Sequence, residues 1–106
     1  MPLDIYTTPD AIVIRASVPG VNPDDVEITV EGSTVTIRGE SKPSKIEDGA
    51  TWLLQEQRYG TFVRAIDLAM PVQSEKAEAK FENGVLTLTI PKAEEIKPRI
   101  IKVKSV

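Results

Sequence analysis

The dipeptide Asn83-Gly84 constrains the fold of this chain most strongly, because it separates two runs of alternating apolar and polar residues. Both residue types tolerate positive φ, which a two-residue type I′ turn between antiparallel strands requires. Such a short loop fixes the register, and a slip of one residue would turn the whole apolar set outward. Residues 77–90 are therefore predicted to form a half-buried hairpin. Its predicted apolar pairs are Phe81 with Leu86, Ala79 with Leu88, and Ala77 with Ile90.

A second hairpin with the same pattern is predicted earlier in the chain. Gly32-Ser33 suits a type II′ turn, which has glycine at its first central position. The resulting register sets Val30 opposite Val35 and Ile28 opposite Ile37. Apolar pairs again share one face, so both hairpins are predicted to contribute to one core.

Other short alternating runs are bounded by turn residues and are predicted as strands at residues 3–7, 11–18, 51–56 and 61–68. Residues 41–50 are rich in Ser, Lys, Pro and acidic residues, and they are predicted to form an exposed loop. The pattern indicates an all-β, antiparallel, immunoglobulin-like β-sandwich of about seven to eight strands. A length of 106 residues fits one domain, predicted at residues 1–92, with a C-terminal extension at 93–106.

The composition argues against several classes of function. The chain has no His and no Cys, which excludes a Cys–His nucleophile and zinc ligation. A balance of 13 basic and 16 acidic residues argues weakly against a nucleic-acid partner. The absence of cysteine fits a cytosolic protein, and no apolar run is long enough to cross a bilayer, so we expect a cytoplasmic protein without a membrane partner. We also expect no enzyme activity, no metal and no cofactor, although Asp24, Asp25 and Glu27 form a weak candidate Ca²⁺ site without the usual ligand spacing.

Three features leave alternatives open. Arg64 lies on a predicted apolar face, where it is either an exposed edge charge or a member of a buried or interface ion pair. Trp52-Leu53-Leu54 is either part of a core strand or an arm that packs on another chain. Ile101 and Val103 follow the break at Pro98, and we favour a strand that docks on a free sheet edge over a ragged terminus.

Taken together, these motifs resemble the small heat-shock proteins, whose shared unit is the α-crystallin domain. Residues 79–86 resemble the A-x-x-x-n-G-v-L signature of that family, and residues 18–21 resemble its first Pro-Gly turn. Residues 56–64 are similar to the segment that joins two of its later strands. Ile101-Lys102-Val103 is similar to its C-terminal I-x-I/V anchor. The loop ahead of Trp52 is of the bacterial, archaeal and plant type.

The resemblance implies an ATP-independent holdase that binds partly unfolded client proteins and prevents their aggregation. It implies a homodimer in which the strand around Trp52 pairs with the partner's first strand. It also implies that Ile101 and Val103 dock on a neighbouring dimer and build a higher homo-oligomer. The implied dimer interface is Leu3, Ile5, Trp52, Leu53, Leu54 and Arg64, and the implied anchor groove is Val26, Ile28, Val30, Ala79 and Phe81.

Two departures from the family pattern are visible. The family usually carries an N-terminal arm, whereas here Leu3 follows almost directly on the first Met, so we expect a member that lacks most of the arm. The family commonly has Pro where this chain has Ala69, which is expected to alter only a loop. The alternatives to a holdase are a monomeric co-chaperone-like binding module and an assembly domain without client capture.

Overall fold

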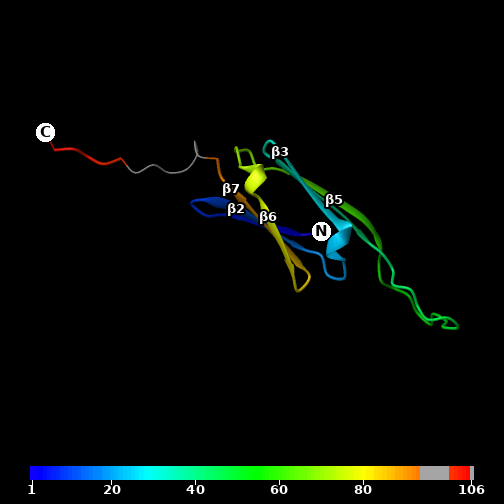
Figure 1. Ribbon diagram of the computed structural model, residues 1–106. Coiled ribbons are helices and arrows are strands. Elements are labelled where there is room, and N and C mark those ends of the chain that lie inside the picture. Colours follow the sequence, from blue (N-terminus) through cyan, green and yellow to red (C-terminus); the bar gives the residue numbers. More distant parts are fainter. Residues whose placement is uncertain (94–100, 106) are drawn as a thin grey trace.

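A computed structural model describes residues 1–93 and 101–105 of the chain and shows two antiparallel sheets packed face to face (Figure 1). One sheet has the strand order β1-β2-β7-β6 and the other has the order β3-β4-β5. The described residues contain no α-helix, and the predicted all-β sandwich is confirmed with seven strands. The elements are β1 (Leu3–Thr7), β2 (Ala11–Ser17), η1 (Pro23–Asp25), β3 (Val26–Glu31), β4 (Thr34–Ser41), β5 (Gly60–Asp67), η2 (Ser74–Lys76), β6 (Glu78–Glu82) and β7 (Val85–Pro91).

The β6–β7 hairpin has the predicted turn and register. Asn83 and Gly84 have φ values of 53° and 76°, as a type I′ turn requires. Phe81 pairs with Leu86, and the next apolar pair follows in the same register. The predicted pairing of Ala77 with Ile90 is wrong, because β6 begins one residue later. Ala77 instead ends the η2 turn, where its N–H donates to the carbonyl of Ser74.

The β3–β4 hairpin is also confirmed in register, with Val30 opposite Val35 and Ile28 opposite Ile37. Gly32 has a φ of 61°, which suits the first central residue of a type II′ turn. Ahead of this hairpin, the side chain of Asn22 accepts a hydrogen bond from the N–H of Asp24 and caps the η1 turn.

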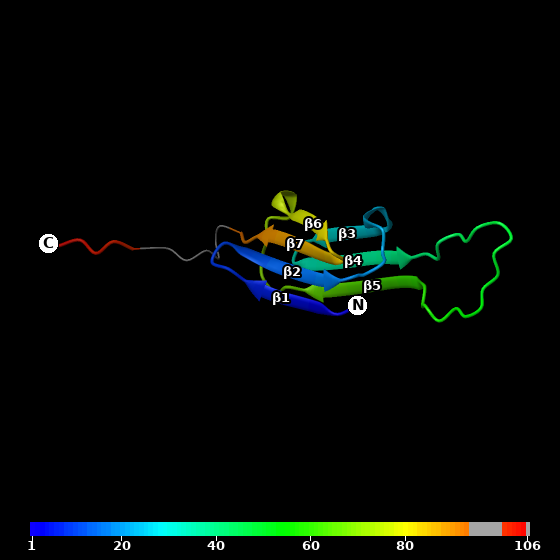
Figure 2. The same cartoon turned by 90° about the horizontal axis from the view of Figure 1, so that it is seen from below.

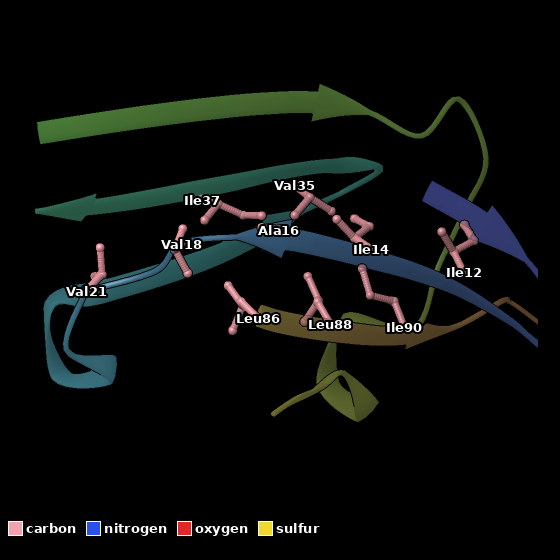
Figure 3. Close-up of a cluster of buried hydrophobic side chains, with 10 residues drawn as sticks. All are labelled: Ile12, Ile14, Ala16, Val18, Val21, Val35, Ile37, Leu86, Leu88 and Ile90. Atoms are coloured by element: carbon pink, nitrogen blue, oxygen red, sulfur yellow. The ribbon is translucent and has the colours of Figure 1, made fainter. Parts of the chain in front are cut away.

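Alternating aliphatic side chains from both sheets meet in one core (Figure 3). Strand alternation sends every second residue of β2, β4 and β7 toward the facing sheet. Each large aliphatic side chain that is fully buried in this way stabilises the fold by roughly 1.5–3 kcal/mol. The buried cluster is Ile12, Ile14, Ala16, Val18, Val21, Val35, Ile37, Leu86, Leu88 and Ile90.

The strand predicted at residues 51–56 is wrong for the single chain. No strand is present between the end of β4 at Ser41 and the start of β5 at Gly60. Figure 2 shows this segment as a long loop that projects beyond one end of the sandwich. There it lies away from every sheet edge of its own chain, so its backbone has no strand to pair with. Asp24, Asp25 and Glu27 do not form a metal-binding group, because no group of three or more acidic side chains within the described residues is placed to hold a metal ion.

The loop after β5 is held by the carboxylate of Asp67. Its Oδ1 atom accepts hydrogen bonds from the backbone N–H of Ala69 and from the Ser33 hydroxyl, both at 2.9 Å. Both hydrogen bonds lower the pKa of the Asp67 carboxyl below its ordinary value, and the bond from Ala69 has the larger effect. Ala69 itself has a φ of 58°, in the left-handed region that costs an L-residue roughly 1–2 kcal/mol. Proline cannot adopt this φ, so this loop conformation is accessible to Ala69 but not to a proline at the same position.

Ala69→Gly is therefore expected to raise the free energy of unfolding by about 0.5–1 kcal/mol. Glycine removes the conformational strain of a positive φ. This gain in free energy is larger than the free-energy cost of the additional backbone entropy that glycine loses on folding. Ala69→Pro should lower it by roughly 3 kcal/mol, since it also removes the N–H that donates to Asp67. Urea unfolding midpoints test both changes. The matched control is Ala65→Gly inside β5, which should destabilise the fold; stabilisation by both glycines would contradict the strain argument.

Candidate interaction surfaces

The edge strands β3 and β6 border a hollow on one side of the sandwich, and this hollow exposes polar and apolar surface in similar amounts. Each is the last strand of its sheet, so each has one edge without a neighbouring strand in the described chain. Figure 2 shows the two strands on the same side of the molecule. The hollow has a volume of about 350 Å³ and is lined by Ile28, Val30, Ser74, Glu75, Ala77, Ala79 and Leu88.

The hollow is suited to aliphatic side chains from an extended segment. Ile28 and Val30 form one wall, and the small side chains of Ala77 and Ala79 leave space on the other. An apolar cavity of about 150 Å³ accommodates one benzene molecule, so this hollow is large enough for two branched aliphatic side chains. The free backbone groups of an edge strand can also pair with an added strand.

The structure brings together part of the residue set predicted for the groove. Ile28, Val30 and Ala79 line the hollow, whereas Val26 and Phe81 are half-buried and do not line it. Sequence reasoning missed the floor residue Leu88, although its position opposite Ala79 in the predicted hairpin was a signal for it. It also missed Ser74 and Glu75, because residues 69–76 were assigned to a loop, whereas Ala77 lies at the start of the hairpin strand that was predicted to border the groove.

The predicted anchor residues are exposed in the single chain. Ile101 is 84% exposed and Val103 is 96% exposed. A strand was predicted over 99–104; residues 99 and 100 lie outside the described residues, and 101–105 are not in a strand. The role of Ile101 and Val103 as anchors therefore stays a prediction.

Exposed apolar side chains also gather on the long loop. Trp52 is 49% exposed, Leu53 is 99% exposed, and Leu54 is largely exposed as well. On the sandwich, the outer edge of β1 has no neighbouring strand, and Ile5 on this strand is 44% exposed. Leu3 is half-buried against the core. Contiguous apolar exposure of this kind marks an interaction site more often than an isolated exposed residue does.

Arg64 is exposed on β5, opposite Ile37 in the register. Its Nη1 donates a hydrogen bond to the backbone carbonyl of Met1 at 3.0 Å and so connects β5 to the chain entering β1. Within the described residues, both ion pairs involve Lys42, with Asp25 and with Glu40. A buried ion pair for Arg64 inside one chain is therefore not found, and the interface ion pair stays a prediction.

Another hollow, of about 630 Å³, lies on the outer face of the first sheet, and its lining combines apolar surface with side chains of both charges. Its charged residues are Asp4, Arg15, Lys80 and Glu82. Arg15 lies over the Tyr6 ring and donates to its hydroxyl, so the guanidinium already has a partner. In the part of the chain that the structure describes, no helix is long and apolar enough to cross a membrane.

Comparison with known proteins identifies relatives along nearly the whole chain. The family described as Hsp20/alpha crystallin matches residues 4–104. Spore protein SP21 of Stigmatella aurantiaca is 35% identical over 102 residues, which are 96% of this chain and 60% of that protein. The 17.4 kDa class I heat shock protein of Arabidopsis thaliana is 39% identical over 92% of this chain and 64% of its own length. The chain thus spans about three-fifths of these relatives.

Solved structures share the same fold. Heat shock protein 16.0 from Schizosaccharomyces pombe superimposes with a TM-score of 0.80 at 28% identity, over 99% of this chain and 96% of that one. A small heat-shock protein from Xylella fastidiosa, described as having a distinct high order structure, gives a TM-score of 0.72 at 31% identity, over 98% and 95% of the two chains. The match over residues 4–104, with the sandwich and hairpin turns described above, leads to one conclusion. The chain belongs to the Hsp20/alpha crystallin family of small heat-shock proteins.

Proposed function

We propose that this protein is an ATP-independent holdase that binds partly unfolded proteins and prevents their aggregation. The observation that carries the proposal is that one chain exposes both a groove between two free sheet edges, with aliphatic side chains in its lining, and an aliphatic anchor that could fill it. Apolar surfaces that are covered in an assembly and uncovered on dissociation can bind exposed apolar segments of a client without nucleotide hydrolysis. Membership of the family supports this activity.

The unit of assembly in this proposal is a strand-exchanged homodimer. Trp52, Leu53 and Leu54 have the composition of a strand but no edge to pair with in their own chain. The free outer edge of β1, with Leu3 and Ile5, offers a partner in a second copy. Such pairing would bury the exposed apolar side chains of the loop, and Arg64 next to β1 would then lie at the interface.

Dimers would associate further through their tails. Ile101 and Val103 contribute roughly 1.5–3 kcal/mol each at best when a neighbouring dimer buries them. The loss of translational and rotational freedom offsets much of this gain, so a single tail binds weakly. Several tails in one assembly bind together more tightly, because each docked tail raises the effective concentration of the others. Each single contact still opens quickly. The assembly is therefore stable as a whole, and its grooves become exposed when single tails dissociate.

Replacing Ile101 and Val103 by glycine is expected to lower the native mass to that of a dimer. The double variant removes both anchors and leaves every sandwich residue unchanged. Sedimentation velocity measures the mass, and the matched control exchanges the two residues as Ile101→Val with Val103→Ile, which retains the apolar anchors. Ala79→Leu, which fills the groove from the other side, should give the same dimer.

Three outcomes would contradict parts of this proposal. A wild-type mass that is already dimeric, and unchanged in the glycine variant, would exclude the tail from assembly. A monomer at micromolar concentration would exclude the exchanged dimer and favour the alternative of a co-chaperone-like binding module. Failure to suppress client aggregation, tested as described in the Discussion, would favour an assembly domain without client capture.

A further inference from the structure

The elements that border the β3–β6 groove carry an excess of negative charge. Glu75 lines the hollow itself. The other charged residues of β3, η2 and β6 do not line it: Lys80 and Glu82 line the hollow on the outer face of the first sheet, and Glu27 lines a separate hollow with Arg38. These other charged residues comprise four further glutamates, Glu27, Glu31, Glu78 and Glu82, and two lysines, Lys76 and Lys80. The carboxylate of Glu75 is in neither of the ion pairs found among the described residues.

The anchor segment has the opposite charge. Residues 99–104 contain Arg99, Lys102 and Lys104 and no acidic residue, although the whole chain has a formal net charge of -3. In an extended strand, successive side chains point to opposite sides. When Ile101 and Val103 point into the groove, Lys102 and Lys104 therefore point out of it, toward its mouth and rim.

We propose that Lys102 and Lys104 are specificity-determining residues for assembly: in a tail docked from a second copy they pair with the carboxylate of Glu75, which lines the groove. The inference rests on the tail docking of the proposed function and adds a charge requirement to it. The apolar anchors contribute the buried contact area. The lysines make the groove bind a tail of this chain in preference to an apolar segment of neutral or negative charge. Complementary charge at a rim acts mainly on the association rate and on the response to salt.

Salt separates the two contributions because they respond in opposite directions. The screening length falls from about 10 Å at 0.1 M to about 3 Å at 1 M ionic strength, which weakens exposed ion pairs. Apolar burial is not weakened by sodium chloride, and sulfate strengthens it. An assembly held by anchors alone would keep its mass in 1 M sodium chloride. An assembly that also uses Lys102 and Lys104 should lose mass.

The test uses sedimentation velocity of the full chain at 0.1 M and 1 M sodium chloride over a range of protein concentrations. We expect Lys102→Gln with Lys104→Gln to weaken association between dimers roughly five- to tenfold at 0.1 M, because each exposed pair contributes a few-fold. The variant should also lose most of its response to salt. The matched control is Lys102→Arg with Lys104→Arg, which retains both charges and should assemble like the wild type.

A charge exchange identifies the partner. Glu75→Lys alone and Lys102→Glu alone should each assemble less than the wild type, and an equimolar mixture should regain mass, because each reversed charge then meets its complement. The charge proposal fails when the glutamine variant has wild-type mass and salt response while the Ile101→Gly, Val103→Gly variant falls to a dimer. Tail docking itself fails when that glycine variant leaves the mass unchanged, so the two failures are distinguishable.

Discussion

Replacing Gly39 by valine is expected to lower the free energy of unfolding by about 2 kcal/mol and the melting temperature by roughly 10 °C. The cause is the aromatic ring of Phe62, which lies opposite Gly39 in the β4–β5 register. A Cβ atom at position 39 would lie 2.2 Å from the Phe62 Cζ atom, closer than any real contact. Every other glycine of the chain has positive φ, so Gly39 alone is required for space and not for backbone conformation.

A double-mutant cycle tests this cause. Phe62→Ala removes the ring, so the valine side chain then occupies space that is already free. The double variant should lose less free energy of unfolding than the two single variants lose together, by at least about 1 kcal/mol. Thermal unfolding is compared at one protomer concentration, because association shifts apparent stability. Additive losses would show that the ring is not the obstacle.

The two hairpins could be predicted because the residues that determine their turns and registers are close together in the sequence. Asn83-Gly84 and Gly32-Ser33 fix turn type and register within a few residues, and the structure confirms both registers. The close contact between Gly39 and Phe62 could not be predicted, because β4 and β5 are joined by a long loop that sets no register. The apolar pattern alone does not show which residue of β5 faces Gly39.

The candidate surfaces were only partly predictable for a related reason. The run at residues 51–56 has the composition of a strand, but a strand also needs a partner, and none is available in the same chain. The groove depends on how two sheets meet at their edges, so Ile28 and Ala79 were found whereas Ser74 and Glu75 in the η2 turn were not. The assignment of Ile101 and Val103 as anchors, and of Arg64 as an interface residue, stays a prediction.

Client protection is the second large effect that we expect. Heating an aggregation-prone client protein with an equimolar amount of this chain should suppress most of its light scattering in the absence of ATP. The physical reason is that dissociating assemblies expose the β3–β6 groove and the apolar loop residues, which then cover apolar segments of the unfolding client. An unrelated protein of similar size and charge, present at the same concentration, controls for crowding.

This scattering measurement also tests the central claim most directly, that reversible covering of apolar surfaces is what makes the chain a holdase. The account predicts strong suppression by the wild type and altered suppression by Ala79→Leu, in which the groove is filled while the remaining surface is unchanged. Nucleotide should make no difference to either protein. Scattering as high with the wild-type chain as with the crowding control would contradict the account and leave a sandwich that assembles without capturing clients.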